Sequence, residues 1–336
     1  MTKTEFLLNR RSGFGGSDVA AILGLSKYKT ALDIYNDKID TEKPQDDQSE
    51  AAYFGTILED VVAKEFQKRT GMKIQKVNQS IRAGELGWMI ANIDRGVVNP
   101  EISGTVRVIE DEQKIVELGG RRITTDAILE CKTANQFMAD LWGPSQEDEI
   151  NPGNVVTEHK IPIYYETQVQ WYLGVTGARV AYVAVLLGGS DFRIYQVIRD
   201  NAVIEALQSR CHDFWFEHVL KNVPPEVANI EDVLKMFPND NGNMQEATNE
   251  QATDIGELRT LSERIKELKA QEEVVKARLI TSIGESTGLL IAGEKACTYK
   301  HQSRNTFDSN RFKKEQPDQY NKYIKTSETR VFRLAD

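Results

Sequence analysis

The hydrophobic pattern of the first 225 residues alternates between helical and strand-like spacing. A glycine-rich loop at 13–16 precedes a helix that Ser17 or Asp18 would cap. Residues 54–70 have the three- and four-residue apolar spacing of an amphipathic helix, and Gly71 is placed to end it. The chain is therefore predicted to begin with two helical segments.

Most later apolar runs in this region are strand-like. The expected strands are 72–81, 88–98, 106–110, 114–120, 125–133, 178–188 and 191–199. Residues 99–124 look like a hairpin inserted between two strands, whereas 162–175 and 201–220 have helical periodicity. Helices and antiparallel strands mixed in one unit predict an α/β or α+β domain over residues 1–225, with helices on both faces of a sheet.

The last third of the chain has a different pattern. Residues 226–253 are polar and acidic, which indicates a linker. Over 254–285, leucine, isoleucine and valine recur at heptad spacing, with a break at Glu272. This segment is half of a helical hairpin, a coiled coil or a helix packed on the first domain. Residues 286–336 form a basic C-terminal segment that ends in the strand-like VFRL.

The composition is that of a globular protein, with 336 residues, 40% hydrophobic and 28% charged. No segment approaches the ~18 unbroken apolar residues that cross a bilayer, and the N-terminus lacks the apolar region of a secretion signal. We therefore expect a cytoplasmic protein that does not contact membranes. The distant positions of Cys131, Cys211 and Cys297 argue against a disulfide scaffold, a zinc ribbon or an iron–sulfur cluster.

The net charge of -9 counts against a nucleic-acid partner, but the charge is unevenly distributed. Residues 226–273 hold 12 acidic and 5 basic side chains, whereas the first thirty residues carry net +3 and residues 300–335 net +5. Basic ends around an acidic middle could bind phosphate locally. Ordinary variation of a protein surface would produce the same distribution.

The segment ILECK at 128–132 is the first candidate for chemistry. In a strand, alternate side chains share a face, so Glu130 and Lys132 point the same way and Cys131 points the other. A carboxylate and an ammonium are costly to bury in an apolar strand without a purpose. An ion pair at a sheet edge is the alternative.

Asp94 and Glu59 are the other candidate acids. Asp94 ends the 88–98 strand before an expected turn at 95–96, where its carboxylate could join that of Glu130 on one Mg²⁺ or Mn²⁺, ions that prefer oxygen ligands. Aspartate is also a common turn residue. Glu59 shares the buried stripe of its helix, where a metal or its bound water could pair with it; otherwise it faces solvent at the helix edge.

Gln168 is the last candidate, on the 162–175 helix among aromatic residues that are core by their spacing. It could orient a water, a catalytic side chain or a phosphate.

The order of these pieces is more specific than any one of them. The segments are RRSGFGGSDVAAILGLSKYKT (10–30), FGTILEDVVAKEF (54–66), ANIDRGVV (91–98), ILECKT (128–133) and YETQVQWYLGVTG (165–177). In this order they resemble the PD-(D/E)XK nuclease superfamily, and more narrowly the lambda-exonuclease/YqaJ-type viral recombinase family. The tail at 293–334 also resembles the C-terminal segment of longer phage members.

The resemblance implies a restriction-endonuclease-like central mixed sheet flanked by helices, with a C-terminal helical and basic extension. It also implies a metal-dependent deoxyribonuclease, foremost a 5′-to-3′ exonuclease. Such an enzyme digests one strand of linear duplex DNA for phage-type homologous recombination by single-strand annealing. By this likeness, Asp94, Glu130 and the backbone carbonyl of Cys131 ligate Mg²⁺, for which Mn²⁺ substitutes.

The same likeness assigns the remaining roles. Lys132 would orient or activate the attacking water, with Gln168 beside it, and Glu59 would complete the site directly or through water. Ser17 and either Arg10 or Arg11 would hold the 5′-phosphate. A single-strand annealing protein is the implied partner, a ring-shaped homo-oligomer around DNA the implied assembly, and a phage or prophage gene expressed in the bacterial host cytoplasm the implied setting.

Two features depart from the family pattern. The 99–124 insertion makes the gap between Asp94 and Glu130 long, so Asp126 competes for the aspartate role, although the strand-end position favours Asp94. The acidic segment and the heptad helix are absent from the minimal family unit. An endonuclease of the same fold, or a catalytically weak protein that binds DNA ends or a partner, remains an alternative.

Overall fold

The computed structural model describes residues 8–41, 49–83, 87–111, 120–145, 161–326 and 329–335. The chain divides into two compact units, Met1–Val233 and Leu234–Asp336. Within the described part of the chain, no helix combines the length and apolar character needed to span a membrane. Most of the strand expected at 114–120 lies outside the described residues.

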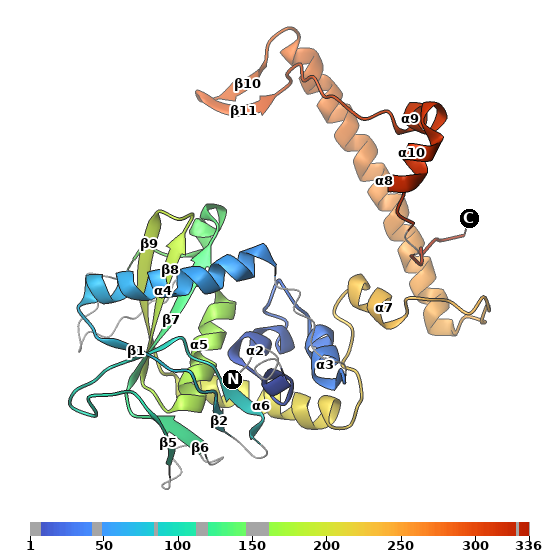
Figure 1. Cartoon of the computed structure of the whole chain (residues 1–336). Coiled ribbons are helices and arrows are strands. Elements are labelled where there is room, and N and C mark those ends of the chain that lie inside the picture. The colour runs from blue at the N-terminus through green and yellow to red at the C-terminus, as the bar shows by residue number, and fades with distance from the viewer. Residues whose placement is uncertain are drawn as a thin grey trace. The chain divides into compact units, whose positions relative to one another are not determined.

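A five-stranded mixed sheet forms the centre of the first unit (Figure 1). Its strand order is β1 (Ile74–Lys76), β4 (Arg95–Val97), β7 (Ala127–Ala134), β8 (Val180–Leu187) and β9 (Asp191–Ile198). The pair β7–β8 is parallel and the other three pairs are antiparallel. A parallel pair needs a crossover connection, and the helix α5 (Ile163–Thr176) lies in that connection. The predicted mixed sheet flanked by helices is confirmed.

Helices cover opposite faces of β7. The helix α4 (Glu50–Thr70) begins after the capping residue Ser49 and ends at Gly71, whose φ of 71° is the left-handed conformation that glycine adopts easily. Its buried residues form an apolar cluster with Leu129 of β7. The neighbouring Glu130 instead contacts Gln168 of α5. Because successive strand residues point to opposite faces, α4 and α5 lie on opposite sides of this strand.

A second, four-stranded antiparallel sheet has the order β3 (Met89–Ala91), β2 (Ile81–Ala83), β6 (Gly120–Ile123) and β5 (Val108–Asp111). The antiparallel pairing of β5 with β6 agrees with the hairpin expected within 99–124.

The single strands expected at 88–98 and 72–81 are wrong. Each region contributes to both sheets, and the chain passes from β3 to β4 through residues 92–94. Arg95 and Gly96 are therefore strand residues rather than a turn. At Gly96 a Cβ would lie 2.6 Å from Val106 Cγ1, so the close packing of these segments requires glycine.

The described part of the first unit also contains the helices α2 (Gly16–Ile22), α3 (Ala31–Ile39) and α6 (Asn201–Phe214), the last followed by a π-helical turn at Trp215–Val219. Phe14, just before α2, packs its ring 5.1 Å from that of Trp215. This contact brings the start of the chain against its later helices.

The helix α7 (Ile230–Met236) lies within the segment expected to be a linker. Asp232 of α7 is fully buried and accepts a hydrogen bond of 2.8 Å from Thr30 Oγ1, so this part of the segment belongs to the first unit. A carboxylate buried with partners is structured chain rather than a free linker.

The second unit contains the 35-residue helix α8 (Asn249–Ile283), the hairpin β10 (Gly288–Ile291) with β11 (Glu294–Thr298), and the short helices α9 (Ser309–Glu315) and α10 (Pro317–Tyr323). The strand expected at VFRL is wrong, since 331–334 has no strand conformation and pairs with no strand among the described residues.

Candidate active site

Asp94 lies immediately before β4, next to the middle of β7. Its Oδ2 accepts a hydrogen bond of 2.8 Å from the backbone N–H of Cys131. The pairing of β4 with β7 is confined to Ile128 and Leu129, so Cys131 lies just beyond it. Since the N–H and C=O of a strand residue point to the same side, the Cys131 carbonyl also faces the Asp94 side of the strand.

Glu130 is held from two directions. Its Oε1 accepts hydrogen bonds of 2.7 Å from Lys132 Nζ and 2.7 Å from Gln168 Nε2. Lys132 Nζ in turn donates to Gln168 Oε1 at 3.1 Å, which closes a triangle of three side chains. The other carboxylate oxygen, Oε2, is buried and has no hydrogen-bond partner. A buried oxygen in this state is costly, and a cation bound there would satisfy it.

Burial is the largest influence on the pKa values of these groups. Burial, and next the charge of Glu130, raise the pKa of Asp94 well above its usual range. Burial also raises the pKa of Glu130. For Lys132, burial acts to lower the pKa, but Glu130 and Asp94 outweigh it and the pKa is raised. Because the charge of Glu130 disfavours ionisation of Asp94, a cation between the two carboxylates would stabilise them.

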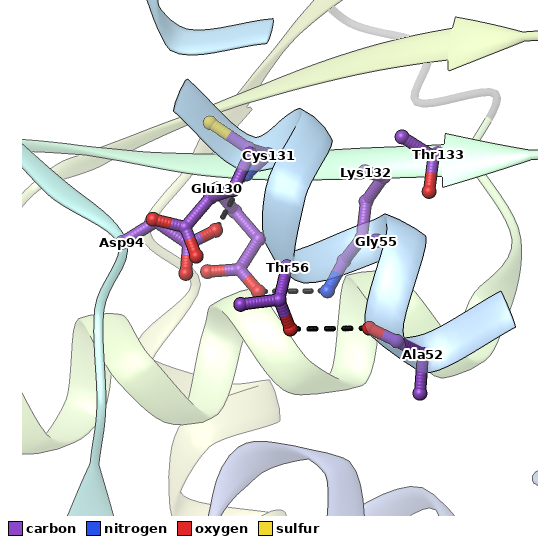
Figure 2. A pocket seen from close by; sticks show the side chains of 9 residues that line it. Ala52, Gly55, Thr56, Asp94, Glu130, Cys131, Lys132 and Thr133 are labelled. Carbon is purple, nitrogen blue, oxygen red and sulfur yellow. Dashed lines mark hydrogen bonds and ion pairs between the residues drawn. The ribbon is translucent and has the colours of Figure 1, made fainter. Parts of the chain in front are cut away.

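The two carboxylates point into one pocket of about 250 Å³ beneath α4 (Figure 2). Glu59, Lys132 and Gly55 also line this pocket. The unpartnered Glu130 oxygen, the opposed acids and the all-oxygen donor set fit a small hard cation such as Mg²⁺. Within the described residues, no three His, Cys, Asp or Glu side chains cluster as a metal-binding group.

Glu59 lines this pocket but forms ion pairs with two basic side chains. Its Oε1 is 2.5 Å from Arg95 Nη1 and 3.7 Å from Lys76 Nζ. Arg95 is 4% exposed and also pairs with Asp60. The sequence reasoning missed Arg95 because it placed this residue in a turn; an arginine in an apolar strand beside Asp94 was the available signal.

A close approach joins this pocket to the N-terminal loop. A Cβ on Gly16 would lie 2.8 Å from Gln168 Cγ and 2.8 Å from a ring carbon of Tyr172. Gln168 Nε2 also donates to the Tyr172 hydroxyl at 3.1 Å. The first turn of α2 therefore lies directly against the side chain that holds Glu130 and Lys132.

Arg10 and Ser17 meet beside this contact. Arg10 Nη2 donates to Ser17 Oγ at 3.1 Å and to Asp18 Oδ1 at 3.3 Å, and Ser17 is exposed. Arg11 Nη2 instead forms an ion pair of 2.7 Å with Asp40. The structure thus brings Arg10, rather than Arg11, together with Ser17.

Asp126, the alternative to Asp94 for the metal-binding aspartate, lies at the far end of β7. It accepts hydrogen bonds from Asn99 at 3.2 Å and Arg179 at 3.1 Å, and it does not line the pocket. Its position four residues from Glu130 along an extended strand places it about 13 Å away.

Comparison with known proteins gives the class of the molecule, a viral recombinase domain. Residues 5–179 match the family model of the YqaJ-like viral recombinase domain. Protein YqaJ of Bacillus subtilis (strain 168) is 32% identical over 343 residues, which cover 100% of this chain and 95% of that protein. The chain belongs to the YqaJ-like viral recombinase domain family.

Two solved structures are also similar. The alkaline exonuclease LHK-Exo from Laribacter hongkongensis has a TM-score of 0.44 and 14% identity, covering 65% of this chain and 93% of that one. A phage-related exonuclease from Haemophilus somnus 129PT has a TM-score of 0.41 and 13% identity, covering 62% of this chain and 96% of that one.

Proposed function

We propose that this protein is a Mg²⁺-dependent exonuclease that digests one strand of linear duplex DNA from its 5′ ends, in phage-type recombination. The observation that carries the proposal is the meeting of Asp94, Glu130 and Lys132 in one pocket, with a buried carboxylate oxygen left without a partner. Family membership supports the same activity.

Asp94, Glu130 and the carbonyl of Cys131 would hold the metal, and Mn²⁺ would substitute for it. When bound, Mg²⁺ lowers the pKa of a ligated water and offsets charge on the phosphoryl oxygens. The N–H of Cys131 fixes one oxygen of Asp94, and Lys132 with Gln168 fixes one oxygen of Glu130. Each carboxylate is therefore oriented and keeps an oxygen for the ion.

Lys132 is proposed to orient the attacking water and to stabilise the negative charge that develops on the phosphoryl group. Gln168 holds its ammonium in place, and the ring of Tyr165 lies 4.9 Å from Nζ. Glu59, paired with Arg95, would act on the metal through a water molecule rather than as a direct ligand.

Arg10 and Ser17 would bind the terminal 5′-phosphate. A guanidinium and a hydroxyl 3.1 Å apart, with the hydroxyl exposed, suit a phosphate oxygen acceptor. Their neighbour Gly16 touches Gln168, so a phosphate held here would lie close to the metal carboxylates. This arrangement favours digestion from 5′ ends.

A single-strand annealing protein as partner, and a ring-shaped homo-oligomer around DNA, complete the proposal. Both rest on the family likeness. The exposed single strand that digestion leaves is the substrate such a partner would need.

Digestion of a 5′-phosphorylated linear duplex, with Mg²⁺ and with EDTA, tests the proposal. We expect activity only with the metal and loss of at least ~10³-fold in Glu130→Ala, as for removal of a group that acts in the transition state. Asp126→Ala removes a carboxylate from the same strand outside the pocket and serves as the matched control. Full activity of Glu130→Ala would refute the proposed site.

Closed circular duplex separates exonuclease from endonuclease activity. The proposal predicts that intact circles survive while the same DNA, once linearised, is degraded. Cleavage of intact circles by the wild type but not by Glu130→Ala would establish an endonuclease at the same site.

A further inference from the structure

The helix α8 of the second unit (Figure 1) carries a seam of partly exposed apolar side chains between Leu258 and Leu279. Its members recur at steps of three and four residues and are 37–52% exposed: Leu258, Leu261, Ile265, Leu268, Val275 and Leu279. From first to last they span about 32 Å of helix. Helices in water gain most of their stability from packing such a stripe, so a partner is needed to cover it.

We propose that this seam pairs antiparallel with α8 of a second copy of the chain. In the proposed register, each residue faces the residue of the second copy for which the two residue numbers add up to 533. Ile265 then packs against Leu268 of the second copy, and Leu258 packs against Val275. The same register sets Leu261 against Glu272. Each contact occurs twice, because the two-fold axis passes midway between residues 266 and 267. This inference is independent of the proposed nuclease activity.

The charges that flank the seam select this arrangement. In heptad notation Leu258, Ile265, Glu272 and Leu279 are a positions and Leu261, Leu268 and Val275 are d positions. In an antiparallel pair, g residues face g residues and e residues face e residues. The pairing then sets Glu257 against Arg278 twice, whereas Arg264 meets the neutral Gln271. On the e side Ser262 meets Lys269, and no like charges face each other.

Antiparallel registers shifted by one heptad lose this complementarity. A shift in one direction sets Arg264 against Arg278 and Lys269 against its own copy. A shift in the other direction sets Arg264 against its own copy and Glu272 against Asp254. Like charges directly opposite each other destabilise a helix pair, so both shifts are disfavoured.

A parallel pair is disfavoured for the same reason. It would bury Glu272 against Glu272 of the second copy and set Arg264 against Lys269. In the antiparallel pair, Glu272 faces an apolar side chain while its carboxylate stays bound to Lys276 Nζ of its own helix, at 2.8 Å. A neutralised polar residue in a seam fixes the register at some cost in stability.

Sedimentation equilibrium of the full chain across a range of concentrations tests the pairing. We expect the wild type to associate reversibly through this pair, so that any ring it forms contains an even number of chains. Ile265→Asp with Leu268→Asp should weaken this association at least a hundredfold. Ala270→Asp with Ala277→Asp places the same two charges on the outer face of α8 as a matched control, and should leave the dimer intact. A strictly monomeric wild type, a trimer, or equal loss in the control would overturn the proposal.

A charge exchange tests direction and register. Glu257→Arg sets arginine against Arg278 at both ends and should weaken the dimer roughly tenfold at low salt. Adding Arg278→Glu restores opposite charges and should restore association. In a parallel pair these positions would face residues 262 and 283 instead, so failure of the second exchange to rescue the first would refute the antiparallel arrangement.

Discussion

Gly16 and Gln168 touch so closely that the addition of one carbon to Gly16 would bring it within 2.8 Å of the glutamine side chain. Gln168 also bonds Glu130 and Lys132. The N-terminal loop is therefore packed directly against a side chain that positions the carboxylate pocket. A substitution in this loop should therefore change the rate of DNA digestion.

Gly16→Ala should push Gln168 away from Glu130 and Lys132. We expect kcat to fall at least tenfold and the free energy of unfolding to drop by about 1–3 kcal/mol, as for other overpacked positions. Steady-state digestion and urea denaturation measure both. Gly15→Ala is the matched control, because a Cβ there meets only Asp18 Oδ2 at 3.9 Å. Equal loss in both variants would mean that the Gln168 contact is not the cause.

Removal of one acid should stabilise the protein without metal and abolish its response to metal. Asp94→Asn relieves the repulsion with Glu130, so its melting temperature in EDTA should equal or exceed that of the wild type. Mg²⁺ at about 100 times its dissociation constant should add about 2.7 kcal/mol to the wild type and nothing to the variant. Thermal unfolding with and without Mg²⁺ measures this. An unchanged response of the variant would remove Asp94 from the metal site.

The two arginines of the N-terminal loop should differ in function. Arg10→Ala should lose the preference for 5′-phosphorylated over 5′-hydroxyl ends, because Arg10 is the one beside Ser17. Arg11→Ala should retain the preference, since Arg11 is bound to Asp40. Competition between the two kinds of end measures the ratio. A reversed result would assign the phosphate to Arg11.

Asp18 should support stability at neutral pH and lose that effect in acid. Burial acts to raise its pKa, but Lys38 and Arg10 outweigh it, so the pKa lies below the ordinary value. The folded protein therefore binds this proton less tightly than the unfolded chain. The contribution is complete above about pH 4 and disappears as pH falls through the folded-state pKa.

Asp18→Asn should lower the free energy of unfolding at pH 7 by about 3–5 kcal/mol, because it leaves the buried Lys38 without its main partner. The difference from wild type should shrink below about pH 4. Asp37→Asn, at an acid that is 38% exposed and also pairs with Lys38, should cost much less. A difference that does not change with pH would contradict the ion-pair explanation. Denaturation at several pH values provides the measurement.

The spacing of apolar residues along the chain was sufficient to predict the long helices and strands. The helix α4, the helix α5 and the strands β7–β9 lie where the apolar pattern of the sequence predicts them. The order of the acidic and basic motifs along these elements was also enough to indicate a nuclease family, which the family match bears out.

Only the tertiary structure decided which acids meet. Asp94 is 37 positions from the Cys131 N–H that it binds, whereas Asp126, far closer in sequence, lies at the other end of the strand. The break at 92–94 moves the chain from one sheet to the other, and short strands of three residues carry too little periodicity to reveal it. The burial of Arg95 beside Glu59, and the Gly16–Gln168 contact, likewise depend on how distant segments pack, because packing rather than local preference determines which charges are removed from water.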